Sequence, residues 1–215
     1  MSTLYSYFRS SAAYRVRIAL NLKGLDYDTV PVHLVRDGGE QLKPAYRALN
    51  VNGLVPTFVD GEANIHQSLA IIEYLEDTHP TPALLPADPV ARAQVRALAL
   101  DIAADIHPID NLRVLRYLKH QLGVTEEQKN AWYVHWVVEG LTSLEARLQA
   151  QAQPGKFTFG DTPTLADCCL VPQIYNANRF KIDMTQFPRI SAVNAHCLTL
   201  DAFQRATPEA QPDAE

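Results

Sequence analysis

The sequence has 215 residues, 47% of them hydrophobic and 20% charged, with a formal net charge of −5, which is the composition of an ordinary soluble globular protein. This length can bury a core in one large domain or two modest ones. The slight acidity and the absence of a basic block argue against a nucleic-acid partner. No run approaches the roughly 18 uninterrupted apolar residues of a membrane span, and no secretory signal pattern opens the chain.

The first predicted elements are a strand and a helix. An apolar run with strand alternation covers residues 4–8, and an amphipathic helical pattern follows it as far as Lys23-Gly24. Ser10 and Ser11 therefore lie where a strand turns into a helix. A serine there can cap the helix, and the positive end of the helix dipole also attracts anions and stabilises a thiolate. Capping is the commoner use of such a pair, and the residues alone leave both uses open.

Strand and helix signals continue to about residue 80. We expect a strand over 26–32, a polar turn over 36–40, a short helix near 45–49, a hairpin over 57–66 with its turn at Asp60-Gly61, and a helix opened by Gln67-Ser68. The first two strands are joined through a helix, which predicts that they pair in parallel. The order β-α-β-α-β-β-α describes a small α/β domain over residues 1–80.

The second half of the chain reads as helical. Residues 78–89 contain four prolines, so we place an extended linker at 81–90 and an all-helical domain at 91–215. We expect its helices over 91–121 with a kink at His107-Pro108, over 126–151, from Thr164 onward and over about 189–205. Thr164 and Asp167 have the spacing of a capping box. Residues 207–215 are expected to be poorly ordered beyond the first few of them.

The cysteines and histidines show no metal-binding pattern, and we expect no metal site. Cys168, Cys169 and Cys197 lack the spacing of metal ligands, so we expect free thiols in a reducing cytoplasm. Six histidines are scattered and read as structural or surface residues: His33, His66, His79, His120, His135 and His196.

Four motifs together resemble one family. They are Arg9-Ser10-Ser11 with the helix after it, Leu54-Val55-Pro56-Thr57, the segment 66–75, and Gly160–Asp167 with its capping box. With the domain order, they resemble the cytosolic glutathione transferases, and within these the zeta class. The resemblance runs from Leu4 to Pro212. It implies a thioredoxin-like N-terminal domain, which is α/β, followed by an all-α C-terminal helical bundle.

The resemblance implies glutathione as cofactor and assigns residues to it. Ser10, Ser11 and Arg9 are the implied catalytic residues. A cis Val55–Pro56 bond would turn the Val55 backbone toward the cysteine of glutathione, as in strand addition. Gln67 and Ser68 would bind the γ-glutamyl carboxylate. The other implied contacts are Ala12, Ala13, Tyr14, Arg15 and Gln41, with His107, Asn111 and Arg113 near glutathione or across a dimer interface.

One position departs from the family pattern. Many zeta-class sequences have cysteine where this chain has Ala12. A mechanism that needs a protein thiol at this position is thereby excluded. Ser10, Ser11 and the helix N-terminus remain to hold a thiolate, and we slightly favour Ser11 for the sulfur contact because it lies one residue deeper in the helix.

The function implied is glutathione-dependent cis–trans isomerisation of maleylacetoacetate to fumarylacetoacetate. A dicarboxylate substrate needs cationic clamps, and arginine binds carboxylates bidentately. Arg9, Arg113 and Arg179 are the predicted substrate-binding residues, whereas Arg15 and Arg17 read as structural within the first helix. Maleylpyruvate isomerase, a general glutathione transferase or a dehalogenase, and a non-catalytic glutathione-binding module remain as alternatives. The resemblance also implies a homodimer.

Overall fold

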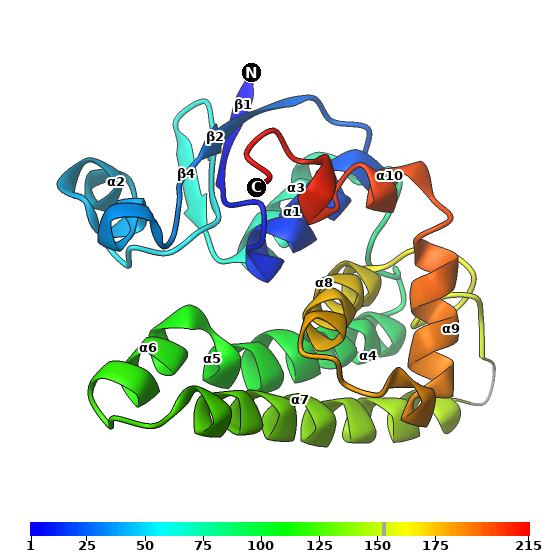
Figure 1. Ribbon diagram of the computed structural model, residues 1–215. Coiled ribbons are helices and arrows are strands. Elements are labelled where there is room, and N and C mark those ends of the chain that lie inside the picture. The colour runs from blue at the N-terminus through cyan, green and yellow to red at the C-terminus, as the bar shows by residue number, and fades with distance from the viewer. Residues whose placement is uncertain (152–153) are drawn as a thin grey trace. The chain divides into compact units, whose positions relative to one another are not determined.

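The computed structural model describes residues 1–151 and 154–215, and they divide into two compact units. The first unit is Met1–Leu84 together with Leu198–Glu215, and the second is Leu85–Cys197. Figure 1 traces both along the chain. The expected boundaries placed all of residues 91–215 in the helical domain. The structure instead groups the last eighteen residues with the first unit, because they pack there.

The first unit is built on a mixed four-stranded sheet of order β2-β1-β3-β4. Its strands are β1 (Ser2–Ser6), β2 (Tyr27–Pro31), β3 (Thr57–Asp60) and β4 (Ala63–His66). As predicted, β1 and β2 pair in parallel and β3 and β4 form a hairpin. The first strand ends two residues earlier than expected, because Tyr7 and Phe8 already belong to a turn.

Three helices complete the predicted order of the first unit. They are α1 (Ser11–Leu22), α2 (Pro44–Leu49) and α3 (Ser68–Thr78), with short 3-10 turns η1 (Arg36–Gly38) and η2 (Glu40–Leu42) before α2. α1 packs against α3. Leu4 and Phe58 from the sheet are buried, as are Ile18 of α1 and Ile72 of α3. The strands and helices therefore share one apolar core. The spacing of the apolar residues that build this core is what predicted the β-α-β-α-β-β-α order from the sequence.

Helices form the second unit, and none of its described residues lies in a strand. The helical segments are α4 (Pro89–Leu100), η3 (Asp101–Ile106), α5 (His107–Asp110), α6 (Leu112–His120), α7 (Glu126–Gln149), α8 (Leu165–Arg179), η4 (Met184–Gln186) and α9 (Pro188–Cys197). Thr164 and Asp167 form the predicted capping box of α8. Within the described ranges of the chain, no helix is long and apolar enough to cross a membrane.

The single helix expected over residues 91–121, with a kink at His107-Pro108, is divided into several helical segments. α4 passes into a π-helical stretch, η3, and His107-Pro108 simply begins the next helical turn. The chain leaves the helix at Asn111, whose backbone is extended with φ −72° and ψ 162°. The Asn111 side chain accepts hydrogen bonds from two backbone N–H groups of α6, so it caps a new helix rather than continuing the old one.

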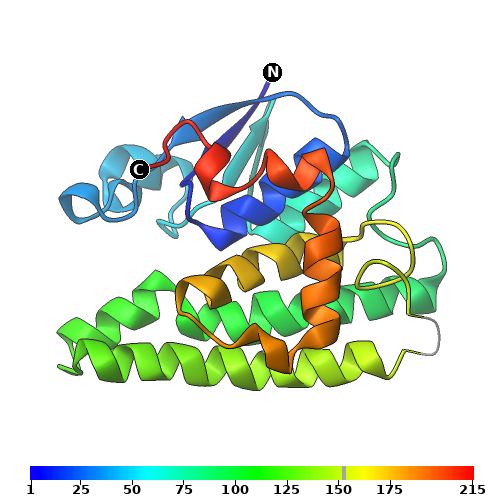
Figure 2. The same ribbon diagram turned by 45° about the vertical axis from the view of Figure 1, so that its right-hand side comes forward.

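The C-terminal segment corrects two expectations. The helix predicted over about 189–205 ends at Cys197, and a separate short helix, α10 (Asp201–Gln204), follows. The tail, expected to be poorly ordered beyond its first few residues, begins with η5 (Pro208–Ala210) and runs beside α1 in both views (Figure 2), and its later residues Asp213 and Glu215 bind the first unit through Phe8 and Arg36. Phe203 and Ala206 are fully buried. These two apolar residues anchor the segment, which composition alone did not reveal.

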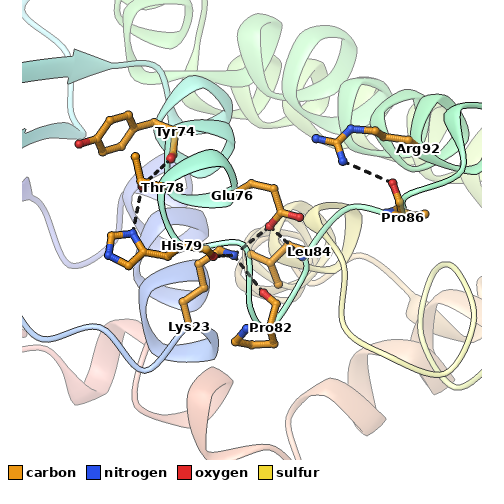
Figure 3. A network of polar contacts seen from close by, with 9 residues as sticks. All are labelled: Lys23, Tyr74, Glu76, Thr78, His79, Pro82, Leu84, Pro86 and Arg92. Carbon is orange, nitrogen blue, oxygen red and sulfur yellow. Dashed lines mark hydrogen bonds and ion pairs between the residues drawn. The ribbon is translucent and has the colours of Figure 1, made fainter.

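A buried ion pair holds the end of Met1–Leu84, the longer of the two segments of the first unit. Lys23 Nζ lies 2.8 Å from Glu76 Oε2 and donates to the carbonyl oxygens of His79 and Pro82 at 2.6 and 3.0 Å (Figure 3). Glu76 Oε2 also accepts from the Leu84 N–H at 2.9 Å. The residues that open the proline-rich stretch are therefore attached to α1 and α3.

Candidate active site

Ser10 acts as the N-cap of α1. A turn brings its N–H to the Tyr7 carbonyl oxygen at 2.9 Å, and its side-chain oxygen accepts the Ala13 N–H at 3.2 Å. Its backbone is extended, with φ −69° and ψ 114°, as an N-cap requires. The capping reading of this serine is confirmed.

Ser11 has a different environment although it is the next residue. It is the first residue of α1 and is 7% exposed. No hydrogen bond joins its hydroxyl to any other described residue of the chain, whereas the Ser10 hydroxyl is already engaged. A donor at a helix N-terminus suits an anionic sulfur, because both the hydrogen bond and the dipole favour the charged form.

The loop before β3 presents a free backbone. The Val55–Pro56 bond is cis, as predicted. The preceding carbonyl, that of Leu54, accepts from Tyr46 Oη at 2.7 Å and Asn50 Nδ2 at 2.9 Å, which holds the loop in place. The Val55 N–H and C=O make no hydrogen bond within the described part of the chain. They fit an extended peptide that pairs with them as one more strand.

Gln67 and Ser68 open α3 as predicted. Gln67 is exposed and has a left-handed backbone, with φ 74°, while Ser68 is buried as the first helical residue. Ser68 Oγ accepts from Arg15 Nη1 at 3.2 Å. Arg15 is 2% exposed, so its guanidinium contacts Ser68 from the interior of the first unit. A buried guanidinium beside a helix N-terminus makes this a favourable place for a carboxylate.

The sheet register explains how three of the motifs come together. Tyr5 of β1 pairs with Thr57 of β3, and Thr57 pairs with His66 of β4. The end of β1, the start of β3 and the end of β4 therefore lie at one edge of the sheet. The segments that lead from the strands to Ser11, Val55 and Ser68 are all at this edge, which forms the candidate site.

Other predicted contacts in the first unit are less accessible. Ala13 and Tyr14 are buried within α1, and Ala12 is half-buried. Gln41 is 5% exposed, and its Nε2 donates to the Leu34 carbonyl oxygen at 3.3 Å within its own loop. A contact between these side chains and a ligand stays a prediction.

Arg9 is exposed next to the serines. Its Nη2 donates to Tyr7 Oη at 2.9 Å, and its guanidinium carbon lies 5.0 Å from the centroid of the Phe8 ring. A cation over an aromatic face is attracted by the ring. Arg9 is therefore held at the turn and keeps an exposed guanidinium for an anion.

The remaining predicted residues lie in the second unit. His107 begins α5, and Asn111 uses its Oδ1 to cap α6, accepting the Arg113 N–H at 3.0 Å. Arg113 is exposed on α6. Arg179 is exposed at the end of α8 and donates to Asn176 Oδ1 at 3.4 Å. Their approach to the residues of the first unit stays a prediction.

The cysteines of the chain are all outside the unit that contains the sheet edge. Cys168, Cys169 and Cys197 are free, fully buried and all in the second unit. Burial raises the pKa of the Cys168 and Cys197 thiols above their ordinary value, so these groups stay protonated. With Ala12 at the start of α1, a thiol at the candidate site has to arrive with a ligand.

Two charged residues support the turn before the serines: Arg17, which the sequence indicates as structural, and Asp213, which sequence reasoning missed. Arg17 is fully buried in α1, and Asp213 lies in the tail; both bind the backbone of Phe8, beside the serines. The position of Arg17 within the apolar run from Tyr14 to Leu20 agrees with that structural role. Asp213 gave no such signal, because its contact spans 205 positions of the chain.

Comparisons with known proteins agree with this geometry. Residues 4–83 match the family model for the glutathione S-transferase N-terminal domain. The probable maleylacetoacetate isomerase of Vibrio cholerae is 54% identical over 211 residues, which cover 98% of this chain and 97% of that protein. The holo structure of a maleylpyruvate isomerase, described as a bacterial zeta-class glutathione S-transferase, has 51% identity and a TM-score of 0.96, covering 99% of this chain and 100% of that one.

A further solved structure is that of maleylacetoacetate isomerase from Methylobacterium extorquens AM1 with bound malonate and glutathione. It has 41% identity and a TM-score of 0.95, and 99% of each chain is covered. These similarities extend over the whole chain. The chain therefore belongs to the zeta class of the glutathione transferase family, which includes the maleylacetoacetate and maleylpyruvate isomerases.

Proposed function

We propose that this protein is a glutathione-dependent cis–trans isomerase that converts maleylacetoacetate to fumarylacetoacetate. The observation that carries the proposal is the unpaired hydroxyl of Ser11 at the N-terminus of α1, in a site with no thiol of its own. The probable maleylacetoacetate isomerase of Vibrio cholerae, whose sequence aligns with 98% of this chain, supports the same reaction.

The residues at the sheet edge fit the parts of glutathione. Ser68, at the start of α3, and the buried Arg15 that donates to its hydroxyl oxygen fit the γ-glutamyl carboxylate. The unpaired Val55 backbone fits the peptide portion, and the Ser11 hydroxyl fits the sulfur. The Methylobacterium relative was solved with glutathione bound, which supports this cofactor.

When bound, glutathione supplies a thiolate that adds reversibly to the cis double bond, so that the carbon–carbon bond can rotate before elimination. Ser11 stabilises the anionic sulfur by donating a hydrogen bond. A thiol pKa near 8.5 in model peptides needs to fall by only about one or two units for the group to be largely ionised at neutral pH. Arg9, Arg113 and Arg179 are the proposed partners of the substrate carboxylates. Malonate, a dicarboxylate, in the Methylobacterium structure supports such a partner.

Maleylpyruvate isomerase is the second candidate function. A structure with that name shares 51% identity with this chain. Both substrates contain a maleyl group with a cis double bond, so the same thiolate chemistry serves either. A general glutathione transferase or dehalogenase activity is a weaker alternative, because the named relatives are isomerases.

Turnover decides between these functions. The purified protein is mixed with maleylacetoacetate or with maleylpyruvate and a substoichiometric amount of glutathione, and the trans product and free thiol are both measured. We expect many turnovers per glutathione and a higher kcat/KM for maleylacetoacetate. A higher value for maleylpyruvate would favour the second candidate, and stoichiometric loss of glutathione would indicate a transferase instead.

We also propose a cytoplasmic homodimer. Three free, buried cysteines suit a reducing compartment, and the zeta-class resemblance implies the dimer. Light scattering of the purified protein should give twice the 23.9 kDa chain mass, and a monomer mass would contradict the assembly. Cell fractionation tests the location.

A further inference from the structure

The turn that carries Ser10 is held by two charged side chains, one of them from the far end of the chain. The Phe8 N–H donates to Asp213 Oδ2 at 3.0 Å, and the Phe8 carbonyl oxygen accepts from Arg17 Nη2 at 3.0 Å. The Tyr7 carbonyl oxygen accepts from both the Ser10 N–H and Arg17 Nη1. Both backbone groups of Phe8 are thus bound to ionisable side chains.

Arg17 connects the turn with the C-terminal segment. Its side chain is fully buried, and it donates to Ser6 Oγ at 3.1 Å and to the Ala206 carbonyl oxygen at 3.0 Å. Burial lowers the pKa of Arg17 to about 10, while nearby groups that include Asp213 favour its charged form. A buried guanidinium is tolerated only when it is well hydrogen-bonded, so the tail and the turn are both needed around it.

The C-terminal segment, residues 198–215, is attached to the rest of the first unit at points on either side of Ala206. Asn21 Nδ2 donates to the Ala202 carbonyl oxygen at 2.9 Å, and Phe203 is fully buried. At the end of the chain, Glu215 forms an ion pair with Arg36 and lies 3.4 Å from His33 Nε2. Asp213 is consequently held between two anchored points.

We propose that the C-terminal segment completes the thiol site, with Asp213 and Arg17 as positioning residues that set the turn over residues 7–10. Ser11 begins α1 directly after this turn, so the direction of its hydroxyl depends on how firmly the turn is held. The catalytic consequence rests on the proposed function. The restraint of the turn itself can be measured without any ligand.

The test compares three single substitutions in the C-terminal segment, residues 198–215. Asp213→Ala removes the acceptor of the Phe8 N–H, Asp213→Asn keeps an oxygen acceptor, and Asp201→Ala removes an exposed carboxylate whose partner is Arg205. We expect amide hydrogen exchange at Phe8 and Ser10 to accelerate about tenfold in Asp213→Ala, because the Phe8 N–H loses its side-chain acceptor. The other two variants should exchange close to the wild-type rate.

The second readout is catalytic. In Asp213→Ala we expect the pKa of the bound glutathione thiol, followed by its ultraviolet absorbance, to rise by about one unit and kcat to fall about tenfold. The KM for glutathione should change little, since Val55 and Ser68 are untouched. In Asp213→Asn and in Asp201→Ala, both the thiol pKa of bound glutathione and kcat should stay close to their wild-type values. Removal of residues 212–215 should reproduce Asp213→Ala.

The outcomes separate the two proposals. Unchanged exchange and unchanged thiol pKa in both Asp213→Ala and the shortened chain would overturn the positioning role. A wild-type protein without isomerase activity would overturn the proposed function, while hydrogen exchange would still decide whether the tail restrains the turn.

Discussion

Ser10 and Ser11 are adjacent but serve different purposes, because a helix N-terminus treats its N-cap and its first residue differently. The Ser10 hydroxyl accepts the Ala13 N–H, whereas the Ser11 hydroxyl has no partner among the described residues. One serine stabilises the helix, and the other is available to a ligand. The sequence-based preference for Ser11 as the sulfur contact was slight, and the geometry now supports it.

Ser11→Ala tests that division directly. Loss of a hydrogen bond to a charged sulfur costs about 1.5–3 kcal/mol, so we expect kcat to fall about 10- to 100-fold and the thiol pKa of bound glutathione to rise. Thermal stability should barely change. The matched variant Ser10→Ala loses the cap and should cost about 1 kcal/mol of stability. An unchanged thiol pKa in Ser11→Ala would assign the sulfur contact to Ser10 or to the helix end alone.

Asp110 gives the second unit a pH-dependent stability. The side chain is 5% exposed, neither carboxyl oxygen has a hydrogen-bond partner, and burial raises its pKa to about 7. Because the folded-state pKa lies above the unfolded value near 3.9, the folded protein binds the extra proton between these values. The contribution of the protonated Asp110 carboxyl to the stability of the folded state is therefore fully present below about pH 4. It is lost as the pH rises through 7 and the buried carboxyl ionises.

Asp110→Asn removes this dependence. At pH 8 we expect the variant to be more stable than the wild type, with an upper bound of about 4 kcal/mol set by the size of the shift, and the advantage should shrink toward pH 5. Thermal unfolding at several pH values measures it. The control is Asp105→Asn at an exposed position nearby. A constant difference between Asp110→Asn and the wild type across this range would contradict the raised pKa.

At the scale of elements, the Lys23–Glu76 pair joins the end of α1 to α3. The Lys23 side chain is fully buried and that of Glu76 is 6% exposed. A buried charge that loses its partner is expensive, whereas an apolar replacement of both can be neutral. The pair therefore makes the two helices and the segment to Leu84 depend on one another.

Lys23→Met should destabilise the protein by about 3–5 kcal/mol, measured by urea unfolding, because Glu76 keeps a buried charge without its cation. The double substitution Lys23→Met with Glu76→Leu should recover much of this loss. Arg205→Met, which breaks only the exposed pair with Asp201, should leave the midpoint nearly unchanged. A small effect of Lys23→Met, equal to that of Arg205→Met, would show that the buried pair contributes little.

At the scale of the whole molecule, the chain returns to its starting unit. Residues 198–215 join Met1–Leu84, although more than one hundred residues separate them. The predicted glutathione contacts at the sheet edge and the Asp213 support lie together in this unit. Of the predicted substrate arginines, Arg9 belongs to this unit, whereas Arg113 and Arg179 belong to the other.

Most elements could be predicted because their signals are local. Strand alternation, the Asp60-Gly61 turn and the Thr164–Asp167 capping box each depend on residues a few positions apart, and the structure confirms them. The helix predicted over residues 91–121, with a kink at His107-Pro108, is not continuous, and the proline lies in the first turn of α5, where it is tolerated. Asn111 provides the break instead.

By itself, the sequence determined the order of the elements over residues 1–80, the family and the absence of a thiol at the start of α1, since each follows from residue identity and short spacing. Only the tertiary structure decided which serine has an unpaired hydroxyl, that Arg15 lies behind Ser68, and that Asp213 binds the Phe8 N–H. These contacts join residues between 53 and 205 positions apart. Partners at such distances are set by packing in the folded chain, and no local pattern encodes them.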